Sequence, residues 1–313
     1  MGRETTLNSL DQLGLIAFAG EDAQAFLHAQ LTSDVSSLAA NSSQYSGYCT
    51  PKGRLLASVL LWRTEQGFYV QLPSSLRESI QKQVSKYILR SKVKARDASG
   101  EFVCLGVAGE SAEASLKQLF DSVPRAPHDV ARHDDITIIR LPVDRFEIAV
   151  PRDKAATVRD ALAKDARAAD QEYWDWLDIR AGIPVITPAT QEEFVPQMVN
   201  FDAIGAVSLN KGCYPGQEIV ARMHYLGRLK QRMYLAHIAA DAAPQPGDKL
   251  YSADLGRQSS GTIVNAAPAP ESGYDALAVI QMSSVEAGGV RWKALDGPAL
   301  NLLTLPYSLK PAT

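Results

Sequence analysis

The spacing of apolar residues alternates between strand-like and helix-like patterns, and this alternation limits the possible folds more than any other feature of the chain. Residues 15–20 read as a short strand, and residues 21–30 then carry apolar side chains at helical spacing. Residues 53–62 and 67–72 predict a hairpin pair, and residues 75–89 predict an amphipathic helix after it. A strand, a hairpin and a helix therefore follow one another in the first third of the chain.

The same types of element return in the middle of the chain. Residues 102–107 predict a strand and residues 112–120 a helix. Strands at residues 136–141 and 145–150 then precede a helix at residues 155–163. No sequence repeat accompanies the pattern. We therefore expect an α+β fold class, with two α+β subdomains of ferredoxin-like character.

The pattern changes after Tyr225. The remaining residues form short apolar runs separated by glycine, proline and serine, without a helical period. The predicted strands lie at residues 233–237, 249–252, 261–264, 276–282, 290–294 and 300–305. Such a segment is typical of a small antiparallel β-barrel. We expect a first domain at residues 1–229 and a C-terminal barrel domain at residues 230–313.

Composition narrows the classes of protein that the chain can belong to. The 313 residues carry a net charge of −3, so the chain lacks the global basic field of a nucleic-acid-coating protein. The 3 cysteines are odd in number and widely spaced, which favours a reducing compartment over a disulfide framework. No signal pattern or membrane-length apolar run occurs in the sequence. These features predict a cytoplasmic protein without a membrane partner.

The strongest local motif is residues 211–218, in which Cys213 lies between Gly212 and Gly216. Lys211 precedes the cysteine by two positions, and a helical pattern follows it. A nearby ammonium group and a helix N-terminus both favour a thiolate. We therefore expect Cys213 to be a functional thiol suited to redox exchange, metal ligation or covalent trapping. Gln217 and Glu218 are expected to fix the loop rather than to react.

Other reactive arrangements are weak. The sequence has no Cys-x-x-Cys pair and no His-Glu-x-x-His spacing, so a self-contained zinc or iron–sulfur site is not expected. Cys104 lies in an apolar run and Cys49 near a turn, where both read as structural cysteines. A papain-like pairing of Cys213 with His224 stays a weak alternative, because no third residue that orients the histidine is evident.

Two segments are rich in cations. Residues 211–232 carry Lys211, Arg222, Arg228, Lys230 and Arg232 against Glu218. A second cluster spans residues 82–96, and its side chains are expected to be an ordinary solvated face at least as much as an anion-binding surface. Trp174 and Trp176 could stack on a heteroaromatic ring or could belong to the core.

Residues 211–218, Lys-Gly-Cys-Tyr-Pro-Gly-Gln-Glu, resemble the signature of the YgfZ family of folate-binding proteins. Segments at residues 30–34, 180–184, 194–200, 220–227 and 305–308 are also similar to that family. The resemblance covers nearly the whole chain. It implies the fold of the related glycine-cleavage T-protein, an aminomethyltransferase: two interleaved ferredoxin-like subdomains and a C-terminal barrel around a folate-sized opening.

The resemblance also implies site residues. Trp174 corresponds to an aromatic wall for the pterin, Leu13 stands where a second aromatic residue sometimes occurs, and Arg222 is a further folate-binding position. The motif positions Lys211, Gly212, Cys213, Tyr214, Gly216, Gln217 and Glu218 are expected to surround the functional thiol. The implied cofactor is tetrahydrofolate or a derivative, without a permanently bound metal.

One departure from the T-protein bears on catalysis. Its catalytic carboxylate lies in a Gly-Gly-Ile-Ile-Asp-Asp type of strand, and this chain has Ala57 and Ser58 in the corresponding segment. Loss of a general acid–base group typically costs a factor of about 10² to 10⁴ in rate. The resemblance therefore implies a folate-binding accessory protein for iron–sulfur cluster synthesis or repair, with an indirect effect on tRNA methylthiolation. The alternatives are a folate-dependent one-carbon transferase and a direct tRNA-binding factor.

Overall fold

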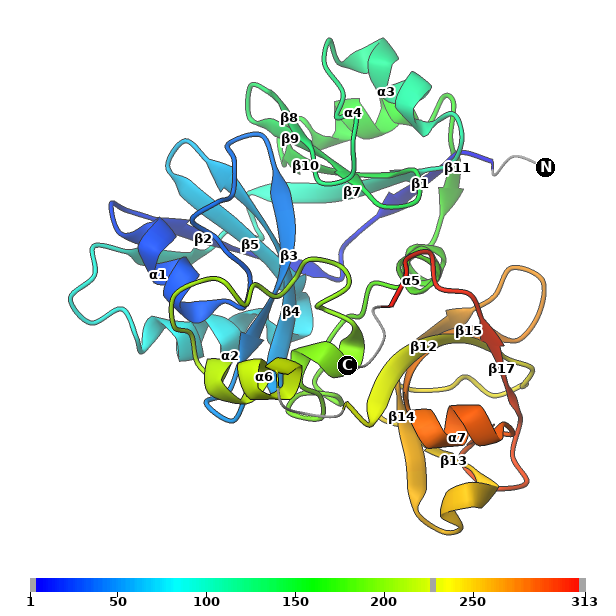
Figure 1. The fold of residues 1–313 in the computed structure, drawn as a ribbon. Coiled ribbons are helices and arrows are strands. Elements are labelled where there is room, and N and C mark those ends of the chain that lie inside the picture. The colour runs from blue at the N-terminus through cyan, green and yellow to red at the C-terminus, as the bar shows by residue number, and fades with distance from the viewer. Residues whose placement is uncertain (1–3, 226–228, 310–313) are drawn as a thin grey trace. The chain divides into compact units, whose positions relative to one another are not determined.

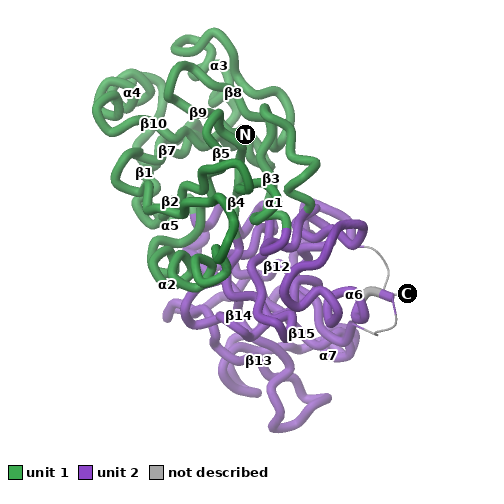
Figure 2. The backbone as a smooth tube through the Cα atoms, turned by 90° about the vertical axis from the view of Figure 1, so that its left-hand side faces the viewer, with its two compact units in different colours: residues 1–28, 34–45, 59–174 green, residues 29–33, 46–58, 175–313 purple. Residues whose placement is uncertain are grey.

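The computed structural model describes residues 4–225 and 229–309 (Figure 1). The chain divides into two compact units, which Figure 2 shows in green and purple. The first unit contains residues 1–28, 34–45 and 59–174, and the second contains residues 29–33, 46–58 and 175–313. The chain therefore passes between the units within helix α1 (Ala23–Gln30), between Ser33 and Asp34, within strands β3 (Ser43–Cys49) and β4 (Leu55–Thr64), and within helix α5 (Gln171–Arg180).

A six-stranded sheet forms much of the first unit. Its strand order is β11 (Arg167–Ala169), β1 (Thr6–Ser9), β7 (Phe102–Ala108), β10 (Arg145–Pro151), β9 (Ile136–Leu141) and β8 (Val130–His133). Helices α3 (Ala112–Leu119) and α4 (Ala155–Leu162) pack on one face, where apolar side chains of β7, β9 and β10 form the core (Figure 1). The predicted strands and helices between residues 102 and 163 are confirmed, whereas the short strands β1, β8 and β11 were not predicted.

The second sheet has five strands in the order β3 (Ser43–Cys49), β4 (Leu55–Thr64), β5 (Gly67–Pro73), β2 (Leu13–Ala19) and β6 (Lys94–Asp97). The predicted hairpin is confirmed, because β4 and β5 pair antiparallel. The predicted first helix is α1 (Ala23–Gln30). Helix α2 (Ser74–Ser85) packs on β2, β5 and β6 through Leu76, Ile80 and Val84.

The helix predicted at residues 75–89 is longer than the observed α2. The backbone continues in tight turns after Ser85, since Tyr87 donates to the carbonyl oxygen of Val84 and Ile88 to that of Ser85. The prediction extended the helix because Tyr87 and Ile88 continue the apolar spacing. Tyr87 is nevertheless exposed.

The third sheet consists wholly of residues from the last part of the chain. It is a curled antiparallel sheet with the strand order β16 (Arg291–Trp292), β13 (Lys249–Tyr251), β14 (Ser259–Pro268), β15 (Tyr274–Gln281), β12 (Gln231–Ile238) and β17 (Leu300–Leu303) (Figure 1). Its core includes Ile238, Ile263 and Trp292, and α7 (Met282–Ala287) packs against it through Val285. The predicted C-terminal β domain is present, and its boundary at residue 230 stays a prediction.

The remaining helices belong to the connections. They are α5 (Gln171–Arg180), α6 (Gln217–Tyr225) and the 3₁₀ helices η1 (Pro196–Val199) and η2 (Ala253–Leu255). Trp174 and Trp176 both lie in α5, and the helix predicted after Cys213 is α6.

Candidate functional site

One face of the six-stranded sheet in the first unit is polar although it is buried. Gly106 of β7 lies opposite Asn8 of β1 and opposite Glu147 of β10, so these positions share one face. Asn8 is fully buried and Glu147 is 3% exposed. Thr6, two residues before Asn8, lies on the same face and is also fully buried. The alternate positions of these strands point into the core beneath α3 and α4. We call the surface with Thr6, Asn8, Gly106, Arg145 and Glu147 the polar sheet face.

The hydrogen bonds of the polar sheet face are incomplete. Gln71 of β5 donates from Nε2 to Oε1 of Glu147, and Nδ2 of Asn8 donates to the carbonyl oxygen of Asp170 at 2.6 Å. Oγ1 of Thr6 and Oδ1 of Asn8 are buried without a hydrogen-bond partner in the described part of the chain. Leaving a buried polar group unsatisfied costs about 1–3 kcal/mol. These oxygens are therefore the unsatisfied acceptors of the polar sheet face.

Trp174 lies on the polar sheet face. It belongs to α5 and is 2% exposed. A Cβ atom built on Gly106 would lie only 2.4 Å from Cζ3 of Trp174, so the indole occupies the space that a side chain at this position would fill. Cζ of Arg145, a fully buried side chain, lies 5.3 Å from the centroid of the ring. The aromatic residue predicted to bind pterin is thus next to Gly106 of β7 and to the buried guanidinium group of Arg145 in β10.

Three residues at this face were not predicted from the sequence: Glu147, Gln71 and Asn8. A signal was present for Glu147, since it is the only acidic residue within the otherwise apolar run of residues 146–150. Gln71 also approaches Cys104, with 3.8 Å between its Nε2 and the Sγ atom. Burial raises the pKa of the Cys104 thiol far above its usual range, and the Glu147 carboxylate raises it further. Cys104 is therefore a neutral thiol.

The other two predicted folate positions lie elsewhere. Leu13 is the first residue of β2 in the five-stranded sheet, paired with Pro73, and it is half-buried. Arg222 is exposed on α6 and belongs to the second unit, whereas Trp174 belongs to the first. Their roles in folate binding stay predictions.

The predicted functional thiol lies in a loop of the second unit that is held against another turn. Cys213 is exposed, as is Gly212. Gly216, directly before α6, has a φ of +82°, and a Cβ atom there would lie 2.5 Å from the N and Cα atoms of Gly53. Of the two glycines beside Cys213, only Gly216 adopts the left-handed backbone that favours glycine. Close contact between two backbone segments therefore positions the loop.

Lys211 holds the same loop from its other end. Its Nζ atom donates to the carbonyl oxygens of Leu31 at 2.6 Å and Ser33 at 3.0 Å, and it lies 5.0 Å from the ring centroid of Tyr214. Gln217 reaches back and donates from Nε2 to the carbonyl oxygen of Lys211 at 3.3 Å. The loop-fixing role of Gln217 stays a prediction, and this contact is its structural support. Lys211 is likewise a positioning residue in the structure, and its predicted effect on the Cys213 thiol remains a prediction.

The aromatic residue of the motif is part of the interior. Tyr214 is buried, and desolvation raises the pKa of its hydroxyl far above the usual range. Burial also raises the pKa of the Cys49 thiol to about 12. Glu218 is exposed in the first turn of α6. Cys213 is therefore the exposed thiol of the described residues, and Tyr214 anchors the loop that presents it.

The segment that corresponds to the carboxylate strand of the T-protein is occupied by packing residues. Ala57 is fully buried in β4. The hydroxyl of Ser58 accepts a hydrogen bond from the backbone N–H of Ile186 at 2.9 Å. Neither residue can act as an acid or a base near neutral pH.

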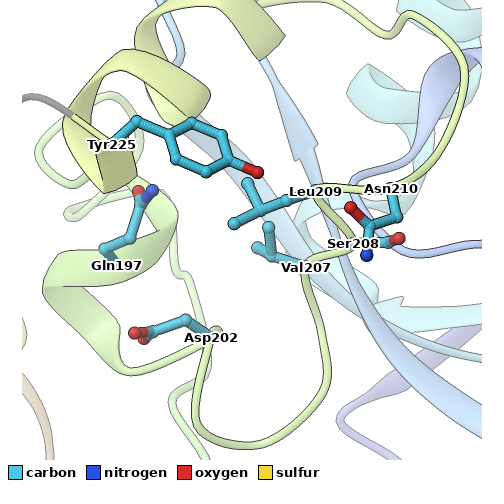
Figure 3. A pocket seen from close by; sticks show the side chains of 7 residues that line it. All are labelled: Gln197, Asp202, Val207, Ser208, Leu209, Asn210 and Tyr225. Carbon is cyan, nitrogen blue, oxygen red and sulfur yellow. The ribbon is translucent and has the colours of Figure 1, made fainter. Parts of the chain in front are cut away.

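A cavity of about 380 Å³ lies beside α6 in the second unit (Figure 3). Its lining residues are Gln197, Asp202, Val207, Ser208, Leu209, Asn210 and Tyr225. Asp202 is paired with Arg232, with 2.7 Å and 3.0 Å between their oxygen and nitrogen atoms. Its carboxylate charge is therefore already neutralised within the unit.

The cations of residues 211–232 are only partly available. Lys211 and Arg232 make the internal contacts described above, and Arg232 is buried. Arg222 and Lys230 are exposed. Arg228 and the side chain of His224 lie outside the described residues. The predicted anion-binding surface of this segment therefore rests on fewer exposed charges than its sequence suggests.

The described residues contain neither a metal-binding cluster nor a membrane-spanning helix. No group of three or more His, Cys, Asp or Glu side chains is placed to hold a metal ion among residues 4–225 and 229–309. No helix within the same residues is long and apolar enough to cross a membrane.

Comparison with known proteins gives consistent matches. Residues 3–174 match the family model of the GCVT N-terminal domain. A tRNA-modifying protein YgfZ from Sodalis glossinidius is 35% identical over 97% of this chain and 93% of its own length. The protein of the same name from Klebsiella pneumoniae is 33% identical over 98% of this chain and 94% of its own length.

A solved structure supports the fold. The crystal structure of the glycine cleavage system aminomethyltransferase T from Bartonella henselae superimposes with a TM-score of 0.79 at 20% identity. The match covers 97% of this chain and 86% of that one. The expected fold, shared with the T-protein, is confirmed.

Proposed function

The chain belongs to the YgfZ family, whose curated relatives are named tRNA-modifying proteins, and we propose that it is a folate-binding accessory protein in which Cys213 is the working thiol. In this proposal it supports the synthesis or repair of iron–sulfur clusters in other enzymes, including those that methylthiolate tRNA. The odd number of cysteines fits a reducing compartment such as the cytoplasm.

The polar sheet face is the observation that carries the proposal. A pterin ring presents a ring N–H and an amino group side by side, which a carboxylate such as that of Glu147 can accept together. Oδ1 of Asn8 and Oγ1 of Thr6 are buried acceptors without partners in the described residues, and the buried Trp174 indole packs on Gly106 of the same face. The residues present thus fit a flat, donor-rich heteroaromatic ring. A bound tetrahydrofolate would supply a carrier of one-carbon units.

Cys213 supports the second half of the proposal. The loop that carries it is anchored by Lys211 and by the close approach of Gly216 to Gly53, yet the thiol itself is exposed. An exposed thiol on a fixed loop can meet a cluster or a cysteine of a partner protein. Cys49 and Cys104 lie in strands β3 and β7, and neither is exposed. Burial also raises the pKa of both thiols, so neither forms a thiolate readily.

Ala57 and Ser58 argue against ordinary aminomethyl transfer. One is a buried apolar residue and the other uses its hydroxyl to accept from the backbone of Ile186. A one-carbon transferase that uses Cys213 as the acceptor remains the second candidate, favoured by the T-protein fold. It predicts turnover of a methylene- or formyl-folate by the purified protein, and this turnover would be lost in Cys213→Ser.

The test of the proposal is anaerobic calorimetric titration of the protein with tetrahydrofolate. Glu147→Gln keeps the shape of the side chain and removes its charge. Since a hydrogen bond to a charged group contributes about 1.5–3 kcal/mol, the variant should bind about 10- to 150-fold more weakly. Glu172→Gln is the matched control, because Glu172 is exposed in the first turn of α5. Absence of binding by the unaltered protein would refute the folate-binding role, and equal binding by Glu147→Gln would refute the assignment of the binding site to Glu147.

A further inference from the structure

Residues 82–96 form a surface on the first unit that the proposed function does not use. The segment carries Lys82, Lys86, Arg90, Lys92, Lys94 and Arg96 and contains no acidic residue. All six of these side chains are exposed. We call this segment the basic turn. Its charge stands out in a chain whose net charge is −3.

The basic turn has a defined position in the first unit. It begins in the last turn of α2 and ends in β6, an edge strand of the five-stranded sheet. The backbone N–H of Lys92 donates to Oδ2 of Asp22 at 2.7 Å, and the Val93 side chain is buried. The connection follows α2 as the cyan loop in Figure 1. Its cations are therefore displayed on a segment that is tied down at its C-terminal end.

Half of these cations are not neutralised. Lys82 pairs with Glu78, Lys92 with Glu21 and Arg96 with Glu101. Lys86, Arg90 and Lys94 make no ion pair with any residue that the structure describes. Three exposed cations are thus available to an anionic partner.

Large apolar side chains are exposed between the cations. Tyr87 is 47% exposed, and Leu89, at 86%, is the most exposed large apolar side chain of the described residues. Lysine and arginine on an edge strand often have no function beyond preventing that strand from pairing with another chain. This role would account for Lys94 and Arg96. That explanation does not apply to Tyr87, Leu89 and Arg90, which precede the strand.

We propose that the basic turn binds RNA, with Lys86, Arg90 and Lys94 at phosphates and Tyr87 stacked on an unpaired base. Alternating cations and an aromatic ring are the elements of single-stranded nucleic-acid binding surfaces, in which bases stack and phosphates are neutralised. An unpaired loop of a folded RNA presents both groups, because its bases are free to stack on aromatic side chains. An anionic membrane would also use the cations, Leu89 and the phenol ring, so binding to anionic vesicles is the competing outcome of the test.

This inference goes beyond the proposed function, in which the effect on tRNA is indirect. It also differs from binding through residues 211–232, where Lys211 and Arg232 are engaged within the second unit. Folate binding at the polar sheet face and RNA binding at the basic turn can therefore fail independently.

The test is binding of fluorescently labelled bulk tRNA, measured by anisotropy at several salt concentrations. The variant Lys86→Gln/Arg90→Gln/Lys94→Gln should lose most of the affinity. Three phosphate contacts give a slope of about −2 in log affinity against log salt concentration. A fourfold rise in salt concentration should therefore lower the tRNA affinity of the unaltered protein about 20-fold, and that of the variant far less. Tyr87→Ala should weaken binding about fivefold or more without changing this slope, and Tyr87→Phe should retain affinity.

The control variant Arg125→Gln/Arg159→Gln/Lys164→Gln removes the same charge from exposed positions of the same unit. All variants should keep the thermal midpoint and the tetrahydrofolate affinity of the unaltered protein, which separates this test from that of the proposed function. Equal loss of tRNA binding in both triple variants would overturn the proposal. Absence of tRNA binding by the unaltered protein would also overturn the proposal. The same holds if the unaltered protein binds vesicles of phosphatidylglycerol and phosphatidylcholine and does not bind tRNA.

Discussion

The indole of Trp174 occupies the space in which any residue larger than glycine at position 106 would carry its side chain. This contact fixes the ring on the same sheet face as Glu147 and Asn8, since Gly106 pairs with both residues. It links a feature that the sequence predicted, the tryptophan, to buried polar groups that the sequence did not reveal.

Gly106→Ala should displace the indole and disturb the polar sheet face. Because the added methyl would lie 2.4 Å from Cζ3, we expect a loss of stability of about 1–3 kcal/mol, typical of an overpacked core. Tetrahydrofolate affinity should fall with it. Gly100→Ala is the matched control, since nothing lies within 4 Å of its added atom. Urea unfolding and calorimetric titration check both variants, and an unchanged Gly106→Ala protein would contradict the assignment of this face.

Gly216→Ala should disturb the loop that presents Cys213. The substitution forces an alanine to a φ of +82° and brings its Cβ atom to 2.5 Å from Gly53. Gly205→Ala carries a similar φ of +75° but meets nothing within 4 Å, so it isolates the cost of the dihedral angle. That cost is about 1–2 kcal/mol, and Gly216→Ala should exceed it in urea unfolding. Equal losses for the two variants would show that the contact with Gly53 is not tight.

The three cysteines should differ sharply in reactivity. The thiolate is the reactive species, and burial raises the pKa of Cys49 to about 12 and that of Cys104 further. The native protein should therefore show one fast thiol with an aromatic disulfide reagent, and two slow ones that react only in denaturant. Cys213→Ser should remove the fast phase. A fast phase that persists in this variant would disprove the assignment.

Stability should fall as the pH drops below neutrality, partly because of His128. Burial lowers the pKa of this imidazole, so as the pH falls the unfolded chain takes up the proton more readily than the folded protein does. The folded state is therefore stabilised above the unfolded pKa, which is about 6.5, and loses this contribution below it. His128→Asn suits the φ of +72° and should show a smaller loss of urea-unfolding free energy between pH 7 and 5. An identical loss would exclude His128 as a source.

Elements with a regular apolar pattern were predictable from the sequence. Strands β7, β9 and β10 and helices α3 and α4 have apolar side chains at a period of two residues or at helical spacing. Strand β1 is only four residues long and β3 mixes serine, glutamine and glycine, so neither gives such a pattern. The end of α2 was misplaced because Tyr87 continues the apolar spacing although it is exposed.

The candidate site was predictable only in part, because some of its residues form a local motif and others are brought together by strand pairing. The segment around Cys213 is a local motif, and residue types alone identified it. The polar sheet face depends on the register of β1, β7 and β10, which brings together Asn8, Gly106 and Glu147 from distant parts of the chain. No local pattern encodes such pairing, so Glu147 looked like a single charge in an apolar strand.

The central claim, that the exposed thiol of Cys213 serves other proteins' iron–sulfur clusters, is tested most directly by genetic rescue. A strain that lacks the protein would be supplied with the unaltered chain, Cys213→Ser or the buried-thiol control Cys49→Ala, at equal protein levels. The measured quantity is the methylthiolated fraction of tRNA together with the activity of an iron–sulfur enzyme. We predict rescue by the unaltered chain and by Cys49→Ala, and none by Cys213→Ser. Full rescue by Cys213→Ser would contradict the account.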